Sequence, residues 1–204
     1  MNILTDTLPK TITIRGKQYP INTDFRKGVE FEIIMQESTD NLLKAFALFF
    51  DAFPCEDINN ITKEEFEEIT DAVMWFYCCG KTGEGKSKPT KNKQSYSFTE
   101  DSNAIFADFW NFYSIDLTCE NLHWWAFRSL LEGLPEKSEF KQRIYYRTCD
   151  LKGLPKKEQK RILTIRKSIE IIKKQSVKIT LEERNTKMRE YIANRHKEIK
   201  GGAE

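Results

Sequence analysis

The sequence predicts a mainly α-helical protein with a small N-terminal β-hairpin and a basic C-terminal helical extension. Apolar residues recur at spacings of three and four through most of the chain, which is typical of helices with one buried face. Only residues 11–21, TITIRGKQYPI, alternate like two short strands around a turn at Arg15-Gly16-Lys17. The last third of the chain is rich in Lys and Arg, which sets it apart from the rest.

The composition describes a protein with one core and much charged surface. Of the 204 residues, 39% are hydrophobic and 31% are charged. No apolar run is long enough to span a membrane, and the N-terminus does not have the pattern of a secretory signal. The five cysteines have no framework spacing, so we expect a reduced, cytoplasmic setting.

Capping residues predict where the first helices begin. Asp24 is expected to cap a helix that continues to about Ser38, and Asp40 a second, strongly apolar one. The run Thr62-Lys63-Glu64-Glu65 has the form of a capping box, which opens a third helix that continues to Gly80. The lysine-rich residues 81–97 contain no aliphatic side chain, so they predict a mobile loop.

The stretch 101–135 is the expected centre of the core, because three of the four tryptophans lie in it within sixteen residues. Each large aromatic side chain can bury roughly 150–250 Å². The spacing predicts two helices, the second capped by Thr118 and ended by Gly133 and Pro135. The residues expected to be buried are Trp110, Trp124, Trp125, Phe127, Leu130 and Leu131.

The C-terminal part is predicted to contain three further helices. One covers 139–149 with Phe140, Ile144 and Tyr145 facing inward. A long basic helix is expected from Pro155 to about Gln175, followed by a last helix over about 180–200. We therefore divide the chain into a helical core domain, 1–150, and a basic helical extension, 151–204.

The charge is divided between the two ends of the chain. Residues 135–204 carry a net +10 and residues 1–134 a net −8, which gives the total of +2. In the basic part, Ile162, Ile165, Ile169 and Ile172 form an apolar seam that fits one groove. We expect this seam to serve self-association or partner docking, with intramolecular packing as the competing interpretation.

Residues 80–87, GKTGEGKS, match the phosphate-loop pattern GxxxxGK[ST]. A real site needs a buried strand before the loop and a helix after it, whereas a helical segment precedes this match and a lysine-rich run follows it. Adjacent Cys78 and Cys79 do not have metal-ligand spacing, and His123, which two tryptophans follow, is interpreted as a packing residue. We therefore expect no enzyme activity, no metal, no cofactor and no small-molecule substrate.

Several stretches resemble one family of phage proteins. They are residues 7–26, 75–81, 96–98, 113–135 and 146–147, of which YSIDLTCENLHWWAFRSLLEGLP is the most specific. The resemblance is to the gene-product-fifteen family of tailed phages and prophages of Gram-positive bacteria. Its members are typically encoded among tail genes, near the tail tube and tape-measure proteins.

The resemblance implies a non-enzymatic tail assembly chaperone that binds tail proteins such as the tape measure in the host cytoplasm. The family has no established catalytic or ligand residues, so none is carried over to this chain. An assembly factor of this kind would cover amphipathic helices by helix-in-groove contact. The alternative is a nucleic-acid-binding regulatory protein that uses the basic C-terminal helices. Interleaved glutamates in those helices favour a salt-bridged surface over a nucleic-acid footprint.

Overall fold

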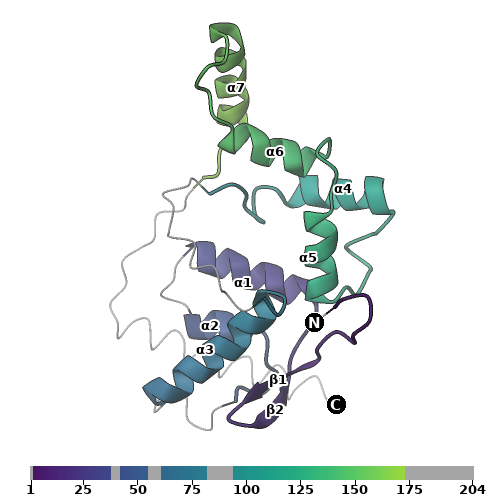
Figure 1. Ribbon diagram of the computed structural model, residues 1–204, viewed down its shortest axis with the longest axis vertical. Coiled ribbons are helices and arrows are strands. Elements are labelled where there is room, and N and C mark those ends of the chain that lie inside the picture. The colour runs from purple at the N-terminus through teal and green to yellow at the C-terminus, as the bar shows by residue number, and fades with distance from the viewer. Residues whose placement is uncertain (1, 38–41, 55–60, 82–93, 173–204) are drawn as a thin grey trace. The chain divides into compact units, whose positions relative to one another are not determined.

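The computed structural model describes residues 2–37, 42–54, 61–81 and 94–172. The predicted fold class is confirmed: the described residues form seven helices and one two-stranded antiparallel sheet at the N-terminus (Figure 1). They belong to two compact units. The first contains the described residues up to 81 together with 122–127, and the second contains 94–121 and 128–172. No helix within these described ranges has the length and apolar character that a bilayer crossing requires.

The predicted hairpin is present in the first unit. Strands β1 (Thr11–Ile14) and β2 (Lys17–Pro20) pair with Ile12 opposite Tyr19 and Ile14 opposite Lys17. Arg15 and Gly16 make the turn with positive φ values of 52° and 72°, the conformation that a two-residue hairpin loop requires. Ile12 and Ile14 are buried, so the alternating pattern places one face of the hairpin against the helices.

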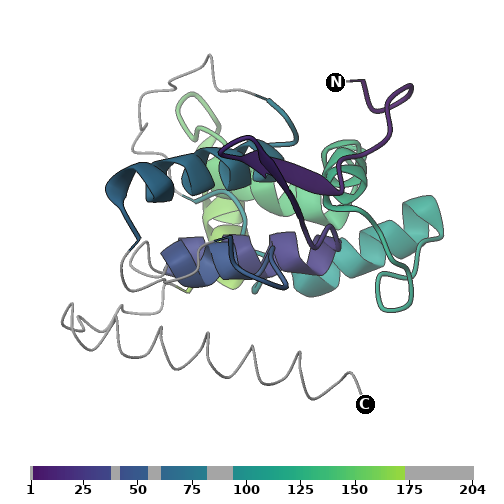
Figure 2. The same ribbon diagram turned by 90° about the horizontal axis from the view of Figure 1, so that it is seen from below.

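Three helices form most of the first unit: α1 (Phe25–Glu37), α2 (Leu42–Ala47) and α3 (Lys63–Tyr77). The Asp24 carboxylate accepts the Arg26 amide, and Thr62 and Glu65 form the complete predicted capping box. α1 and α2 lie side by side, and α3 lies beside the hairpin (Figure 2). Their shared core is made of buried phenylalanines, namely Phe31, Phe46, Phe49 and Phe76.

Residues 122–127, which include the first turn of α5 (Trp124–Glu132), complete this core. The Trp124 Nε1–H donates to the Tyr77 carbonyl at 2.9 Å, and the Trp125 Nε1–H donates to the Phe76 carbonyl at 2.7 Å. Both indoles are buried, and each uses its one polar atom to bind the last turn of α3. The core prediction is therefore confirmed for these two tryptophans.

The predicted cap at Thr118 is wrong, because α5 begins six residues later. The Thr118 hydroxyl bonds instead to Asp116, and His123 takes the position before the helix. The His123 Nδ1 accepts the Trp125 amide at 3.1 Å, while its Nε2–H donates to the Pro9 carbonyl at 2.9 Å. A neutral imidazole thus performs the capping role that sequence rules assign to Ser, Thr, Asp or Asn.

The second unit contains α4 (Ser102–Tyr113), α6 (Glu139–Thr148) and α7 (Lys156–Ser168), and α6 contacts both of the others (Figure 1). The buried carboxylate of Asp108 in α4 accepts the Glu139 and Phe140 amides at 3.1 and 2.8 Å. These are two of the first amides of α6, which have no partner inside their own helix. One side chain of α4 therefore positions the start of α6.

A buried ion pair joins the same two helices. Arg147 of α6 binds both carboxylate oxygens of Asp101 at 2.6 and 2.8 Å, and Arg143 approaches Asp101 at 3.3 Å. Burial would raise the pKa of Asp101, but the hydrogen bonds from Arg147 and from the Ser97 amide outweigh it and hold the pKa below its ordinary value. The pair is thus charged and fully hydrogen-bonded inside the unit.

Two predicted burial assignments are wrong, and both residues face outward. Trp110 is 54% exposed because α4 turns Asp108 and Phe109 inward. Tyr145 is 52% exposed because Arg147, two residues later, takes the inward position beside Phe140 on α6. In both helices a charged side chain with hydrogen-bond partners is buried where the sequence suggested an aromatic ring.

Other predictions are corrected at helix ends or fall outside the described residues. α7 ends at Ser168 rather than near Gln175, because Ile169 leaves the helical conformation with φ −116° and ψ 22°. The Asp40 cap, residues 82–93 of the expected loop and the last predicted helix lie outside the described residues. The division into 1–150 and 151–204 stays a prediction.

Gly28 of α1 tests how closely Trp124 packs. A Cβ at position 28 would lie 2.1 Å from Trp124 Cε3, so the clash should exceed the gain of about 1 kcal/mol that Ala brings to a helix interior. We expect Gly28→Ala to lower the free energy of unfolding by about 1–3 kcal/mol in urea denaturation. The cost should shrink when Trp124 is Phe, whose ring is smaller. Equal costs in the two backgrounds would contradict the proposed contact.

Arg147 and Arg143 make a matched pair for testing the buried carboxylate. Arg147→Met leaves Asp101 buried without its bidentate partner and should cost about 3–5 kcal/mol of unfolding free energy. Arg143 is more exposed, so Arg143→Met should cost about 1 kcal/mol or less. Adding Asp101→Asn to Arg147→Met should recover part of the loss. Equal destabilisation by the two arginine variants would show that Asp101 does not depend on Arg147.

From the environment of His123 we expect the folded protein to lose stability in mild acid. Burial lowers the pKa of this imidazole below its ordinary value, the charge of Lys10 acts in the same direction, and the bond to the Pro9 carbonyl opposes them. Between the lowered folded pKa and the unfolded value of about 6.5, the unfolded chain binds more protons. The free energy of unfolding should therefore fall as the pH drops from neutral through this window. His123→Asn, which retains a capping oxygen, should flatten the dependence in denaturation curves.

Candidate partner-binding surface

Helix α4 has two faces of opposite character. Its inward side consists of Ala104, Ile105, Asp108 and Phe109, all of which are buried. Asp108 is the only charged residue among the twelve of the helix, SNAIFADFWNFY. Since this charge points inward, the solvent side of α4 carries none, although charged residues make up 31% of the chain.

We call the solvent side the α4 aromatic face and define it as Asn103, Phe106, Ala107 and Trp110. Phe106 is 37% exposed and Trp110 is 54% exposed. The spacing of four places their two side chains next to each other along the helix. An exposed aromatic pair without charge has the composition that distinguishes the centre of a protein interface from ordinary surface.

Phe112 is also 37% exposed but belongs to another side of α4. The Lys137 Nζ lies 5.7 Å from the centre of its ring, in a cation–π arrangement. Beyond it, Ser114 ends α4 with a left-handed φ of 56°, and the Tyr113 hydroxyl donates to the Leu130 carbonyl. The end of the helix is thus fixed within the second unit, while Trp110 is turned to solvent.

The four isoleucines of the predicted interface do not form one continuous helical seam. Ile162 is buried in α7, and Ile165 is partly buried in the same helix. Ile169 lies just past the end of α7 and is partly buried, whereas Ile172 is 73% exposed. The burial of Ile162 fits the competing interpretation of intramolecular packing, and the role of the four residues as an interface stays a prediction.

The other sequence patterns fall at structural positions. Helix α3 ends just before the phosphate-loop match, and Gly80, the first residue of the match, has a φ of 72°. The end of a helix therefore precedes the match, where a phosphate loop needs a buried strand. The remaining residues of the match, 82–87, lie outside the described residues. Both ring nitrogens of His123 are used in hydrogen bonds that hold the start of α5. These contacts account for His123 as a structural residue.

Comparison with known protein families gives a match over most of the chain. The family model described as Bacteriophage Gp15 protein matches residues 4–171, which is most of the chain and includes both compact units. No curated protein and no solved structure matches the chain. The family match confirms the resemblance carried by the stretch around Leu122-His123-Trp124-Trp125. The chain therefore belongs to the Bacteriophage Gp15 protein family, which implies a phage structural or assembly protein.

Proposed function

We propose that the protein is a non-enzymatic tail assembly chaperone that binds another phage tail protein through the α4 aromatic face. The tape-measure protein is the expected partner, and the host cytoplasm is the expected place of action. The observation that carries the proposal is Trp110, which is 54% exposed on a helix side without charge. The family match supports the broader role in phage structure or assembly.

The chemistry of the α4 aromatic face favours an amphipathic helix as the partner. Phe106 and Trp110 offer apolar contact, and Asn103 at its edge offers polar contact. A partner with charges at the centre of the contact would lose their hydration without gaining an opposite charge. The apolar stripe of an amphipathic helix meets no such cost, and helix-in-groove contacts use this kind of surface.

A binding role also agrees with the contacts made by the titratable groups whose pKa values are shifted. Asp101 is bound by Arg147 and Arg143, and His123 bonds to Pro9 and to the amide of Trp125. Perturbed groups at an active site are instead aimed at a cleft where a substrate can reach them. The contacts of Asp101 and His123 support structural roles, so we propose that the protein is not an enzyme.

A second candidate function rests on α7, which contains six Lys and Arg residues and one acidic residue. Such a helix could bind nucleic acid as a regulatory protein does. Self-association through residues 156–200, including Ile162, Ile165, Ile169 and Ile172, is a further proposal. Neither of these uses Trp110, so substitutions on α4 separate them from the chaperone function.

The test is co-expression of a tagged chain with the tail proteins encoded beside it, followed by affinity capture and identification of the bound protein. Trp110→Ser should weaken the capture of the tail protein by about 30-fold or more, since a central interface tryptophan contributes about 2 kcal/mol or more. Tyr145→Ser is the matched control, because Tyr145 is 52% exposed but lies on α6. It should capture the partner as wild type does.

Three results would count against the proposal. The first is equal capture by the Trp110→Ser and wild-type chains. The second is equal loss in both serine variants, which would indicate a general effect of surface aromatics. The third is capture of nucleic acid without any tail protein, which would favour the regulatory alternative.

A further inference from the structure

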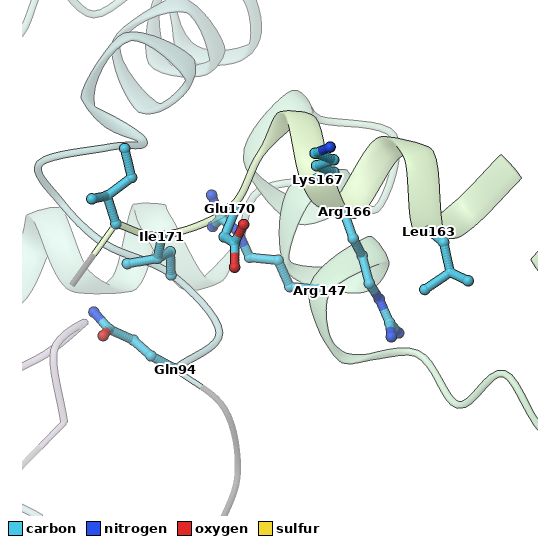
Figure 3. A pocket seen from close by; sticks show the side chains of 8 residues that line it. Gln94, Arg147, Leu163, Arg166, Lys167, Glu170 and Ile171 are labelled. Atoms are coloured by element: carbon cyan, nitrogen blue, oxygen red, sulfur yellow. The ribbon is translucent and has the colours of Figure 1, made fainter. Parts of the chain in front are cut away.

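A pocket of about 760 Å³ lies in the second unit at the end of α7 (Figure 3). Its cationic lining consists of Arg147 from α6 with Arg166 and Lys167 from α7. Its apolar lining consists of Leu163, Ile171 and Ile172. None of these residues belongs to the α4 aromatic face, so the pocket is a separate feature of the unit.

The three cationic side chains of the pocket differ in whether a carboxylate pairs with them. Arg147 is paired with Asp101, which leaves little of its charge for a ligand. Among the described residues, the Arg166 guanidinium donates to neutral acceptors, the carbonyls of Tyr146 and Cys149 and the Cys149 sulfur. Lys167 has no acidic partner in the described part of the chain. Arg166 and Lys167 thus bring positive charge to a lining that also contains Glu170, and no carboxylate of the described residues forms an ion pair with either cation.

The aliphatic lining is open to solvent beside these cations. Leu163 is 51% exposed and Ile172 is 73% exposed, so the two side chains present apolar surface next to Arg166 and Lys167. A ligand that suits both properties carries aliphatic groups and carboxylates on neighbouring positions. Residues three and four apart on a helix are neighbours, so an acidic amphipathic helix has this arrangement.

We infer that this pocket binds an acidic amphipathic segment of another protein, with aliphatic side chains against Leu163 and Ile172 and carboxylates at Arg166 and Lys167. Nucleic acid fits less well, because the described residues of the lining include no aromatic side chain for base stacking. The inference does not depend on the proposed function, since it concerns another surface and another partner chemistry.

The experiment uses the full chain and three labelled synthetic helical peptides in fluorescence anisotropy at near-physiological ionic strength. The first peptide has leucines at every third or fourth position and glutamates between them. In the second each glutamate is replaced by lysine, and in the third each leucine is replaced by serine. We expect the first to bind at least about tenfold more tightly than either of the others, since both charge and apolar contact contribute.

Protein variants then locate the site. Lys167→Glu should weaken binding of the first peptide by about tenfold or more, because it places an anion beside the carboxylates. Lys157→Glu is the matched control, since it makes the same charge change at an exposed position of α7 that does not line the pocket. Trp110→Ser should bind this peptide as wild type does, even if it has lost its tail protein.

Several results would overturn the inference. They are absence of binding by the first peptide, equal binding of the acidic and basic peptides, and equal effects of Lys167→Glu and Lys157→Glu. Displacement of the peptide by millimolar inorganic phosphate would assign the pocket to a simple anion. Tighter binding of a single-stranded oligothymidylate would assign it to nucleic acid. A dimer in light scattering that Lys167→Glu dissociates would make the occupant a second copy of this chain.

Discussion

The bidentate pair between Asp101 and Arg147 is the interaction on which the organisation of the second unit depends. Asp101 precedes α4, and its carboxylate also accepts the Ser97 amide. Arg147 lies in α6 and donates further to the carbonyls of Ser95 and Ile169. One guanidinium therefore joins the start of α4, the body of α6 and the residue that follows α7. A buried charge is tolerated only when it is paired and fully hydrogen-bonded. If these segments separated, the charges of Arg147 and Asp101 would be exposed to solvent or left buried without a partner.

This arrangement explains why the two candidate surfaces of the unit have different chemistry. The carboxylates of Asp101 and Asp108 fix the inward side of α4, so Phe106 and Trp110 face solvent without charged neighbours on the helix. At the other end, Arg147 is satisfied by Asp101, while Arg166 is directed to backbone carbonyls and Lys167 stays exposed. An uncharged aromatic surface and a cationic aliphatic one select different partners, because specificity depends on what each surface repels as well as on what it attracts.

The first unit uses its aromatic residues differently. Trp124 and Trp125 are buried, and their indole N–H groups bond to carbonyls at the end of α3. Gly28 lets Trp124 approach α1 more closely than any other residue would allow. The stretch Leu122-His123-Trp124-Trp125, which carries the most specific family resemblance, thus closes the core of this unit. Its residues pack in this core and cap α5.

Local signals in the sequence were enough to determine the helical class, the hairpin and the beginnings of several helices. The turn at Arg15-Gly16, the cap at Asp24 and the capping box at Thr62 depend on residues within a few positions of each other, so their physics is visible in the chain alone. The orientation of α4 and α6 was decided by tertiary contacts. Sequence patterns assign Trp110 and Tyr145 to the core because large aromatic rings gain most from burial. Asp101 and Asp108 reverse this, because their partners are Arg147 and the first amides of α6, more than thirty residues away. The α4 aromatic face exists because those distant pairs made it favourable to bury charge and leave aromatic rings in water.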